Sequence, residues 1–384
     1  MRALVIAAML CVPFTAEAAG SVLHADDARL AVQSIADDRA VLQVELQGTA
    51  RVVELAPMLR LEREFAPFVP AIARGEDRLF AGTVRGAPAG WARLSRIDGR
   101  WTGLIHDGDS LWFIDPASRH PALAAARGLP DETTLAYRSE DLDLPEGFDA
   151  GGVGDPHDAH AGPGAVAALP APLAPLGMPR YLKVTLVLDT EFRAVHGAAA
   201  ASVAASILNG VDGLYRAQTT VQVSLHHLLA LDSNGSLTST APADLLNAYT
   251  AFVRDSGTPF AGLSHLLSGK DFDGNTVGLA WVGAVCDANG FASGVNQMTL
   301  GAAGNSAVLA HEIGHNFNAA HDSEGNACPA SGFIMAAVLN LGAPASSFST
   351  CSLSTFAQYL SEPLACLDDP PPTGAVLFAD GFEP

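Results

Sequence analysis

Residues 311–321 read His-Glu-Ile-Gly-His-Asn-Phe-Asn-Ala-Ala-His, and this stretch decides the expected fold. On an α-helix, residues four apart share one face, so His311 and His315 can present two imidazoles to one metal ion. His321 lies too far along the chain to stay on that face. The helix must therefore end, and the chain must turn back, for the third imidazole to join the other two.

Three further residues concern the geometry of this helix. Asn318 stands where the chain must turn, and asparagine is the non-glycine residue that most readily adopts the left-handed backbone conformation. Asn305 or Ser306 could cap the start of the helix through a side-chain oxygen. The sequence thus predicts a helix, a turn and a third histidine in that order.

The residue types in this stretch fit zinc chemistry. Neutral imidazole is a preferred zinc ligand, and a catalytic zinc site keeps three protein ligands and a fourth position for water. Glu312 directly follows the first ligand, so its carboxylate can reach that water and act as general base during attack on a carbonyl group. We expect one catalytic zinc ion, held by His311, His315 and His321. A chance match to this pattern is expected on the order of once in a thousand chains, and a polar helix with incidental histidines is the alternative.

Length and composition leave room for two domains. The chain has 384 residues, of which 49% are hydrophobic and 16% charged, so it can bury a sizeable core. Its formal net charge is −20 and its pI about 4.8. Nucleic acids and anionic membrane surfaces repel such a protein, so we expect neither as a main partner.

The N-terminus has the pattern of a secretory signal peptide over residues 1–18. Arg2 supplies a positive charge, residues 3–14 are apolar but too short to span a bilayer, and Ala16-Glu17-Ala18 is a small-residue cleavage pattern. A membrane anchor is one alternative, and a lipoprotein signal at Cys11 is another, although Leu10 does not suit it. We expect a secreted, extracellular protein, which would cross the periplasm if the source is a Gram-negative bacterium.

The remaining cysteines agree with export. Removal of Cys11 with the signal leaves an even number, all in the last third of the chain: Cys286, Cys328, Cys351 and Cys366. This indicates two disulfides, and the sequence leaves all three connectivities open. A zinc-binding cysteine cluster is the alternative, but the separations are too wide for C-x-x-C sites.

Patterns along the chain indicate several segments. Residues 19–146 alternate apolar and polar positions over short runs with Gly-containing turns such as Ile97-Asp98-Gly99, which predicts a mainly antiparallel β domain. Residues 147–179 are rich in Gly, Ala, Pro and Asp and read as an exposed linker. Proteases tend to cut in such segments.

Residues 180–367 have alternating strand and helix patterns. Strands are expected at 181–188, 221–231 and 277–285, and helices at 198–215 and 244–253. This order predicts an α/β layer with a mixed sheet. The tail, residues 368–384, opens with three prolines and is not expected to join the core.

Residues 311–322 resemble the adamalysin (reprolysin) branch of the metzincin zinc peptidases, whose motif is H-E-x-x-H-x-x-G-x-x-H-D. The resemblance implies an α/β (α+β) catalytic domain with a mixed, mostly parallel sheet and an active-site helix. It implies the zinc ligands and the base given above. It also assigns Met335 to a Met-turn beneath the metal and matches Asp322 to the family's acidic residue after the third ligand.

The resemblance covers most of residues 180–367 and implies further features. One segment is similar to the family's edge strand, with which an extended protein or peptide substrate pairs: Gly278, Leu279, Ala280, Trp281, Val282 and Gly283. The family pattern pairs Cys286 with Cys366 and Cys328 with Cys351. We expect a monomer.

The resemblance extends upstream, where residues 79–116 look like the prodomain of the same family. In that family the prodomain assists folding and holds the enzyme inactive, so the chain's own prodomain is an expected partner. It has no cysteine here, so a thiolate cannot block the zinc. We expect latency through bulk occlusion or through a linker group such as Asp155, His157 or His160.

Two other departures from the family pattern stand out. Asn318 replaces the usual glycine of the turn. Lys183 and Gly262 stand where relatives often carry acidic calcium ligands, so we do not expect the family's structural calcium site to be kept. Phe333 and residues 336–348 are expected to form one wall of the specificity pocket, favouring an apolar side chain after the scissile bond.

Two functions from different classes remain open. The first is an active zinc endopeptidase, and the second is a zinc-containing but catalytically silent binding or adhesion module. Glu312 separates them, because loss of the base is the usual sign of a silent copy, and here it is present.

Overall fold

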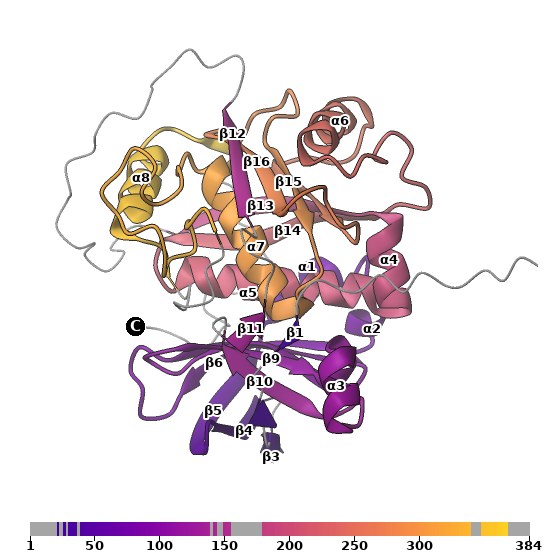
Figure 1. The fold of residues 1–384 in the computed structure, drawn as a ribbon, viewed down its shortest axis with the longest axis vertical. Coiled ribbons are helices and arrows are strands. Elements are labelled where there is room, and N and C mark those ends of the chain that lie inside the picture. Colours follow the sequence, from indigo (N-terminus) through magenta and orange to yellow (C-terminus); the bar gives the residue numbers. More distant parts are fainter. Residues whose placement is uncertain are drawn as a thin grey trace, which may run out of the picture.

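The structure is a computed structural model, and it describes residues 21–22, 26–27, 30–36, 39–138, 141–143, 149–154, 179–338 and 347–367. The expected signal peptide, most of the expected linker and the C-terminal tail lie outside the described residues. Two regions are visible in Figure 1: an N-terminal region (residues 21–143) with a large sheet, and a C-terminal region (residues 149–367) with a second sheet and most of the helices.

The N-terminal region is built on a nine-stranded antiparallel sheet with the order β2-β10-β9-β8-β7-β6-β5-β4-β3. Most neighbours in the sheet are also neighbours in the chain, as the alternating pattern and tight turns predict. Its strands are β2 (Asp26–Asp27), β3 (Leu30–Ala36), β4 (Arg39–Leu46), β5 (Thr49–Pro57), β6 (Arg78–Val84), β7 (Trp91–Ile97), β8 (Arg100–His106), β9 (Leu111–Pro116) and β10 (Thr134–Arg138).

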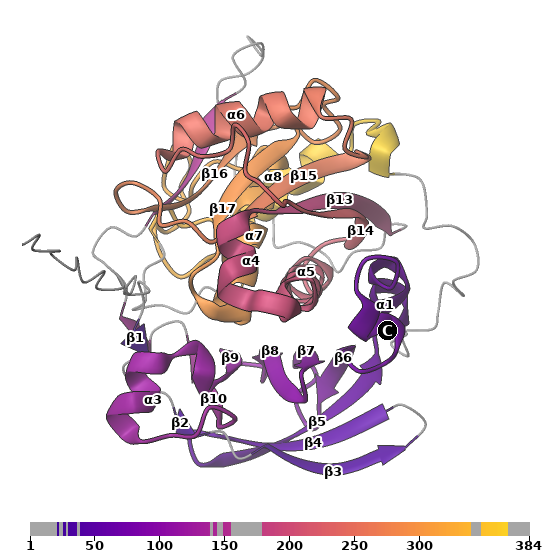
Figure 2. The ribbon, with the colours of Figure 1, turned by 90° about the vertical axis from the view of Figure 1, so that its right-hand side faces the viewer.

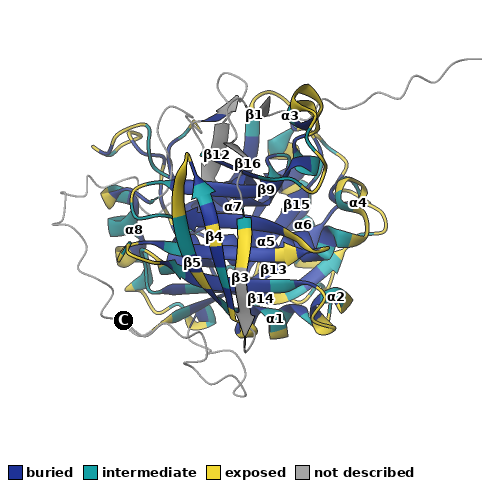
Figure 3. Ribbon diagram, turned by 90° about the horizontal axis from the view of Figure 1, so that it is seen from below, coloured by how far each residue is buried: buried dark blue, intermediate teal, exposed yellow. Residues whose placement is uncertain are grey.

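Two local features of this sheet follow from its sequence. Buried and more exposed residues alternate along β4, which fits a strand with one face on a core (Figure 3). Asp98 and Gly99, with φ of 49° and 77°, form the turn between β7 and β8. Positive φ at both central residues suits a two-residue hairpin, so the predicted turn is confirmed.

The N-terminal sheet is accompanied by short helices, and the alternating pattern does not predict these helices. They are α1 (Leu59–Phe65), α2 (Pro70–Ala73), η1 (Ala117–Arg119) and α3 (Pro121–Arg127). Each has at most seven residues, too few for a helical period to emerge from the sequence. Strands β1 (Ser21–Val22) and β11 (Leu142–Asp143) form a small separate antiparallel sheet.

The C-terminal region is built on a six-stranded mixed sheet with the order β12-β16-β17-β15-β13-β14. Among the described strands of this sheet, β16 and β17 form the one antiparallel pair, so the expected mixed, mostly parallel sheet is confirmed. The strands are β12 (Asp149–Gly154), β13 (Arg180–Leu188), β14 (Val221–Ala230), β15 (Gly262–Ser268), β16 (Thr276–Val282) and β17 (Ser293–Gln297).

Helices cover both faces of this sheet (Figure 2). Helices α5 (Ala200–Arg216) and α7 (Gly301–Asn316) pack together on one face, and α6 (Pro242–Asp255) packs on β16 and β17 with a separate apolar cluster. The other helices are α4 (Thr190–His196), η3 (Gly197–Ala199), α8 (Thr350–Leu360) and η4 (Ala365–Leu367).

Three sequence predictions are corrected here. Residues 149–154, expected within an exposed linker, form β12 on the C-terminal sheet. Strand β16 ends at Val282 rather than at residue 285, because the backbone turns at Gly283, whose N–H donates to the carbonyl of His315. Neither Asn305 nor Ser306 caps α7, which begins four residues before Asn305 at Gly301.

Helix α5 lies between the two sheets (Figure 2) and joins the regions through a shared apolar core. Two of its glycines permit close contact. A Cβ on Gly210 would lie 2.4 Å from Oγ of Ser306 in α7, and one on Gly213 would lie 2.4 Å from Cγ of Arg93 in β7. The stretch Thr190–Arg216 is long and apolar enough to cross a membrane by length and composition, and 61% of its most apolar window is buried inside the protein.

Candidate metal centre

Helix α7 presents His311 and His315 on one face, as their spacing predicts. Their Nε2 atoms lie 3.0 Å apart, and Nε2 of His321 lies 3.2 Å from Nε2 of His315. Ligands at zinc–nitrogen distances of about 2.0–2.1 Å in a tetrahedron are separated by about 3.3 Å, so the spacing fits zinc. In the described part of the chain, these three buried histidines form the group whose donor atoms converge within 4.8 Å.

The other ring nitrogen of each histidine is held by a protein oxygen. Nδ1 of His311 lies 2.6 Å from the carbonyl of Ile334, and Nδ1 of His315 lies 2.8 Å from that of Ala319. Nδ1 of His321 lies 3.1 Å from a carboxylate oxygen of Glu324. These acceptors fix the proton on Nδ1, which leaves every Nε2 lone pair directed to a common point. Burial, with the nearby histidines, lowers the pKa of His315 well below its usual value, which favours the neutral form that binds metal.

The chain turns back after α7 at the expected residue. Asn318 has a φ of 72°, in the left-handed region, and Oδ1 of its side chain lies beside Gly283. The N–H of Ala319 donates to the carbonyl of Gly314, and the N–H of Asn318 donates to that of His315. These bonds close the helix end and direct the following residues toward His321.

Met335 is fully buried and lies against α7, on the side where Gly314 has no side chain. A Cβ on Gly314 would lie 2.4 Å from Sδ of Met335, so any larger residue here would have to displace that side chain. Asp322 fixes the segment that follows His321. Its N–H donates to the carbonyl of Met335 (2.8 Å), and its Oδ1 accepts a hydrogen bond from Ser349 (2.5 Å).

Glu312 is fully buried, and its carboxylate lies against β16. A Cβ on Gly278 would lie 2.2 Å from Oε1 of Glu312. The absence of a side chain at Gly278 therefore leaves the space that the carboxylate occupies, beside the strand expected to bind substrate.

The residues expected to form the edge strand lie together, but the edge is covered. Gly278 to Val282 belong to β16, and Gly283 follows in the turn. Strand β12 pairs with β16 in parallel, with Gly151 opposite Leu279 and Gly152 opposite Ala280. Trp281 packs edge-on against Phe291 and donates to Thr250, which supports a packing role.

Sequence reasoning missed several residues that hold this site. Nδ2 of Asn316 donates to the carbonyls of Trp281 (2.9 Å) and Ser293 (3.2 Å), which ties α7 to β16 and β17. Oδ1 of Asn316 lies 3.0 Å from Nε2 of the buried His265, whose pKa burial lowers to about 4 despite this contact. Asn316 stands inside the motif and so was detectable, whereas nothing in the spacing of His265 or Glu324 points to a role.

Both disulfides join the pairs that the resemblance implies. Cys286 pairs with Cys366 and Cys328 with Cys351, with Cα–Cα distances of 5.7 and 6.1 Å. The second bond links the loop after His321 to the start of α8. The expected roles of Asp155, His157 and His160 fall outside the described residues, as does most of the expected pocket wall at 336–348.

Comparison with known proteins identifies this part of the chain. Residues 179–358 match the Reprolysin_5 model of metallo-peptidase family M12. The segment is a reprolysin-like metzincin domain. Two zinc metalloproteinase-disintegrin-like proteins of Naja atra, kaouthiagin-like and atrase-B, are each 34% identical over 115 residues. The match covers 29% of this chain and 19% of each relative, so the chain spans about a fifth of the length of these relatives.

This segment is thus of the zinc metalloendopeptidase class, and the convergence of its three histidines supports zinc as the metal. The fold is also similar to the crystal structure of metalloproteinase-II from Bacteroides fragilis, with a TM-score of 0.50 and 13% sequence identity. That similarity covers 85% of this chain and 92% of the other. It concerns the fold alone and extends beyond residues 179–358 into the N-terminal region.

Proposed function

We propose that this chain is a secreted zinc endopeptidase whose N-terminal region is a prodomain. The observation that carries the activity is the convergence of the three Nε2 atoms, each with its Nδ1 already engaged, beside the buried Glu312. Such a donor set fits a catalytic zinc site with one position left for water. When bound there, zinc would activate that water and polarise a substrate carbonyl.

The chain's own residues have distinct roles in this proposal. Glu312 takes the proton of the attacking water and passes it to the leaving amine, since a buried carboxylate next to the first ligand is placed for general acid–base catalysis. The backbone of β16 pairs with an extended substrate by strand addition. Asn316 keeps β16 at a fixed distance from α7, because its amide bonds to Trp281 in the strand.

Casein digestion tests the activity. The chain is cut in the linker and assayed with and without a zinc chelator, beside a Glu312→Ala variant that should still bind zinc. We expect chelator-sensitive activity in the wild type and a loss of at least about 10²–10⁴-fold in the variant. A wild-type protein that binds one zinc per chain but cleaves no peptide would instead support a silent binding module.

Latency in this proposal comes from β12. The edge of β16 that is already paired with residues 149–154 cannot pair with a substrate. The prodomain's lack of cysteine removes a thiolate block, so occupation of the strand edge supplies a physical alternative. Cleavage in the Pro-rich segment after β12 would then need to be followed by release of this strand.

Intact protein provides the test of latency. A Gly152→Pro variant removes one N–H donor and disfavours pairing with Ala280, so basal activity of the uncut chain should rise several-fold. Ala167→Pro, in the Pro-rich part of the linker, is the matched control and should change nothing. If uncut wild type digests casein as fast as the cut form, β12 does not confer latency.

Export is the remaining part of the proposal. The pattern of residues 1–18 and the two disulfides both suit an oxidising, extracytoplasmic environment. N-terminal sequencing of protein from the medium of an expressing culture should begin close after Ala18. A mature N-terminus at Met1 in the cell interior would contradict export.

A further inference from the structure

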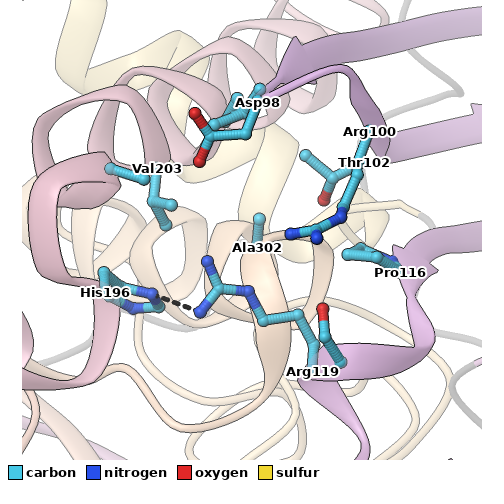
Figure 4. Close-up of a pocket in the computed structure, with 11 residues that line it drawn as sticks. Asp98, Arg100, Thr102, Pro116, Arg119, His196, Val203 and Ala302 are labelled. Carbon is cyan, nitrogen blue, oxygen red and sulfur yellow. Dashed lines mark hydrogen bonds between the residues drawn. The ribbon is translucent and has the colours of Figure 1, made fainter. Parts of the chain in front are cut away.

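A cavity of about 250 Å³ lies at the junction of the two regions, away from the three histidines (Figure 4). Its walls come from the turn between β7 and β8, from β9 and η1 on one side, and from α4, α5 and the first turn of α7 on the other. A void of about 10–15 Å³ already holds one water molecule, so this space admits a hydrated polyatomic ligand. Any ligand here would contact both regions at once.

Two guanidinium groups share this cavity. Figure 4 shows the side chains of Arg100 and Arg119 extending into the same space from neighbouring parts of the N-terminal region. Burial lowers the pKa of Arg119, and the charge of Arg100 adds to this effect, whereas the charges of Asp115 and Asp98 oppose it. Both groups nevertheless stay charged, because arginine does not lose its proton in proteins.

Neither guanidinium has a carboxylate partner among the residues that the structure describes. This is notable in a chain with 41 acidic and 21 basic residues. Two other arginines at the junction of the regions, Arg60 and Arg93, both pair with the buried Asp212. Asp115 lies near Arg119, but its oxygens already accept hydrogen bonds from Thr102 and Tyr137.

His196 supplies a third donor from the other region. Its Nδ1 lies 2.6 Å from Nη1 of Arg119, so Nδ1 accepts that hydrogen bond and Nε2 carries the proton. Burial, together with Arg119, lowers the pKa of His196 to about 3, which keeps the ring in this neutral form. Its Nε2–H is buried and has no hydrogen-bond acceptor in the described part of the chain.

We propose that this cavity binds a small tetrahedral oxyanion of the phosphate type between Arg100, Arg119 and His196. Guanidinium groups recognise oxyanions with two parallel hydrogen bonds, and three donors from different directions suit a tetrahedral acceptor better than a planar carboxylate. The charges of Asp98 on the rim and of Asp115 near Arg119 oppose an anion, so direct hydrogen bonds from the three side chains carry the binding. The bound anion would stabilise the docking of the two regions, because it contacts both. This proposal does not depend on peptidase activity.

Calorimetric titration of the intact chain with inorganic phosphate, at an ionic strength held constant with chloride, tests the proposal. We expect saturable binding of one phosphate per chain, weaker binding of acetate, and a rise in Tm of roughly 2–4 °C at saturation. Arg100→Gln, at the exposed rim, and Arg119→Gln should each weaken binding by about tenfold or more. Arg254→Gln, at an exposed arginine that pairs with its neighbour Asp255, is the matched control and should bind like wild type.

Three results would overturn the proposal. Absence of saturable binding would show that the cavity is not a site. Equal binding by Arg100→Gln and wild type would indicate an adventitious ion only, and that variant is informative even if Arg119→Gln fails to fold. Acetate binding as tight as phosphate would exclude a preference for tetrahedral anions.

Discussion

The two sheets of this protein differ in how far apart in the chain their paired strands lie. In the N-terminal sheet most strands pair with the strand next to them in the chain, through short turns. In the C-terminal sheet most pairs are parallel and need helical crossovers such as α5 between β13 and β14. Both disulfides also lie in the C-terminal region. These parallel pairs join distant parts of the chain and therefore form slowly, and they lie in the region that carries the metal centre.

The regions are nevertheless not independent. Asp212 in α5 is fully buried and accepts hydrogen bonds from Arg60 (3.0 Å) and Arg93 (3.3 Å), both from the N-terminal region. Glu64 of α1 accepts from the N–H of Leu225 in β14. The N-terminal region thus supplies charged groups that form hydrogen bonds inside the C-terminal region.

Asp212→Ala should give the largest effect on stability. It would remove the buried carboxylate that Arg60 and Arg93 share, although Arg60 keeps its pair with Glu64, and the loss costs about 3–5 kcal/mol in free energy of unfolding. Urea unfolding followed by tryptophan fluorescence measures this. The control Asp255→Ala, in an exposed ion pair, should cost no more than about 1 kcal/mol. Similar costs for both variants would mean that the interface charges do not couple the regions.

Loss of the Cys328–Cys351 bond should come next. It closes a loop with a sequence separation of 23 residues that contains Met335 and follows His321. A Cys328→Ala, Cys351→Ala double variant should lose about 3 kcal/mol in the chain-entropy account. Hydrogen exchange should show faster opening of α7 and α8 with the N-terminal sheet unchanged. Equally faster hydrogen exchange in both sheets would contradict the division between the two regions.

Gly278→Ala should separate activity from stability within the C-terminal region. The new Cβ would lie 2.2 Å from Oε1 of Glu312, and the flexible carboxylate can move aside at little cost to the fold. A displaced base should lower kcat by about 10²-fold, with zinc content and Tm close to wild type. Gly274→Ala, in the turn before β16, puts its new Cβ in open space; its φ of 77° costs stability, so it is the control for activity alone. Undiminished kcat in Gly278→Ala would show that Glu312 is not confined as described.

A fall in pH should produce the smallest of these effects, a decrease in the free energy of unfolding. Burial, and then the charge of Arg119, lower the pKa of His196 to about 3 in the folded chain, against an ordinary value of 6.5. Between these values the unfolded state binds more protons, so the free energy of unfolding falls as pH drops from 6.5 toward 3. The urea midpoint of His196→Gln should fall less between pH 7 and pH 5 than that of wild type. Identical pH profiles would contradict the burial of a neutral ring next to Arg119.

The sequence predicts the parts of this protein that are periodic or that form a motif. The hairpin at Asp98, the helix that carries His311 and His315, and the left-handed turn at Asn318 follow from local rules, and the structure has all three. The disulfide pairing follows from family resemblance rather than from spacing. What could not be predicted depends on contacts between distant segments. The pairing of residues 149–154 with β16 and the bonds of Arg60 to Asp212 leave no periodic trace in a single sequence.

Metal analysis of three purified proteins tests the central claim, that the C-terminal region holds one catalytic zinc through its three histidines. The account predicts one zinc per chain in wild type and in Glu312→Gln, little zinc in His315→Ala, and peptidase activity after linker cleavage in wild type alone. Full zinc content in His315→Ala, or wild-type activity in Glu312→Gln, would contradict it.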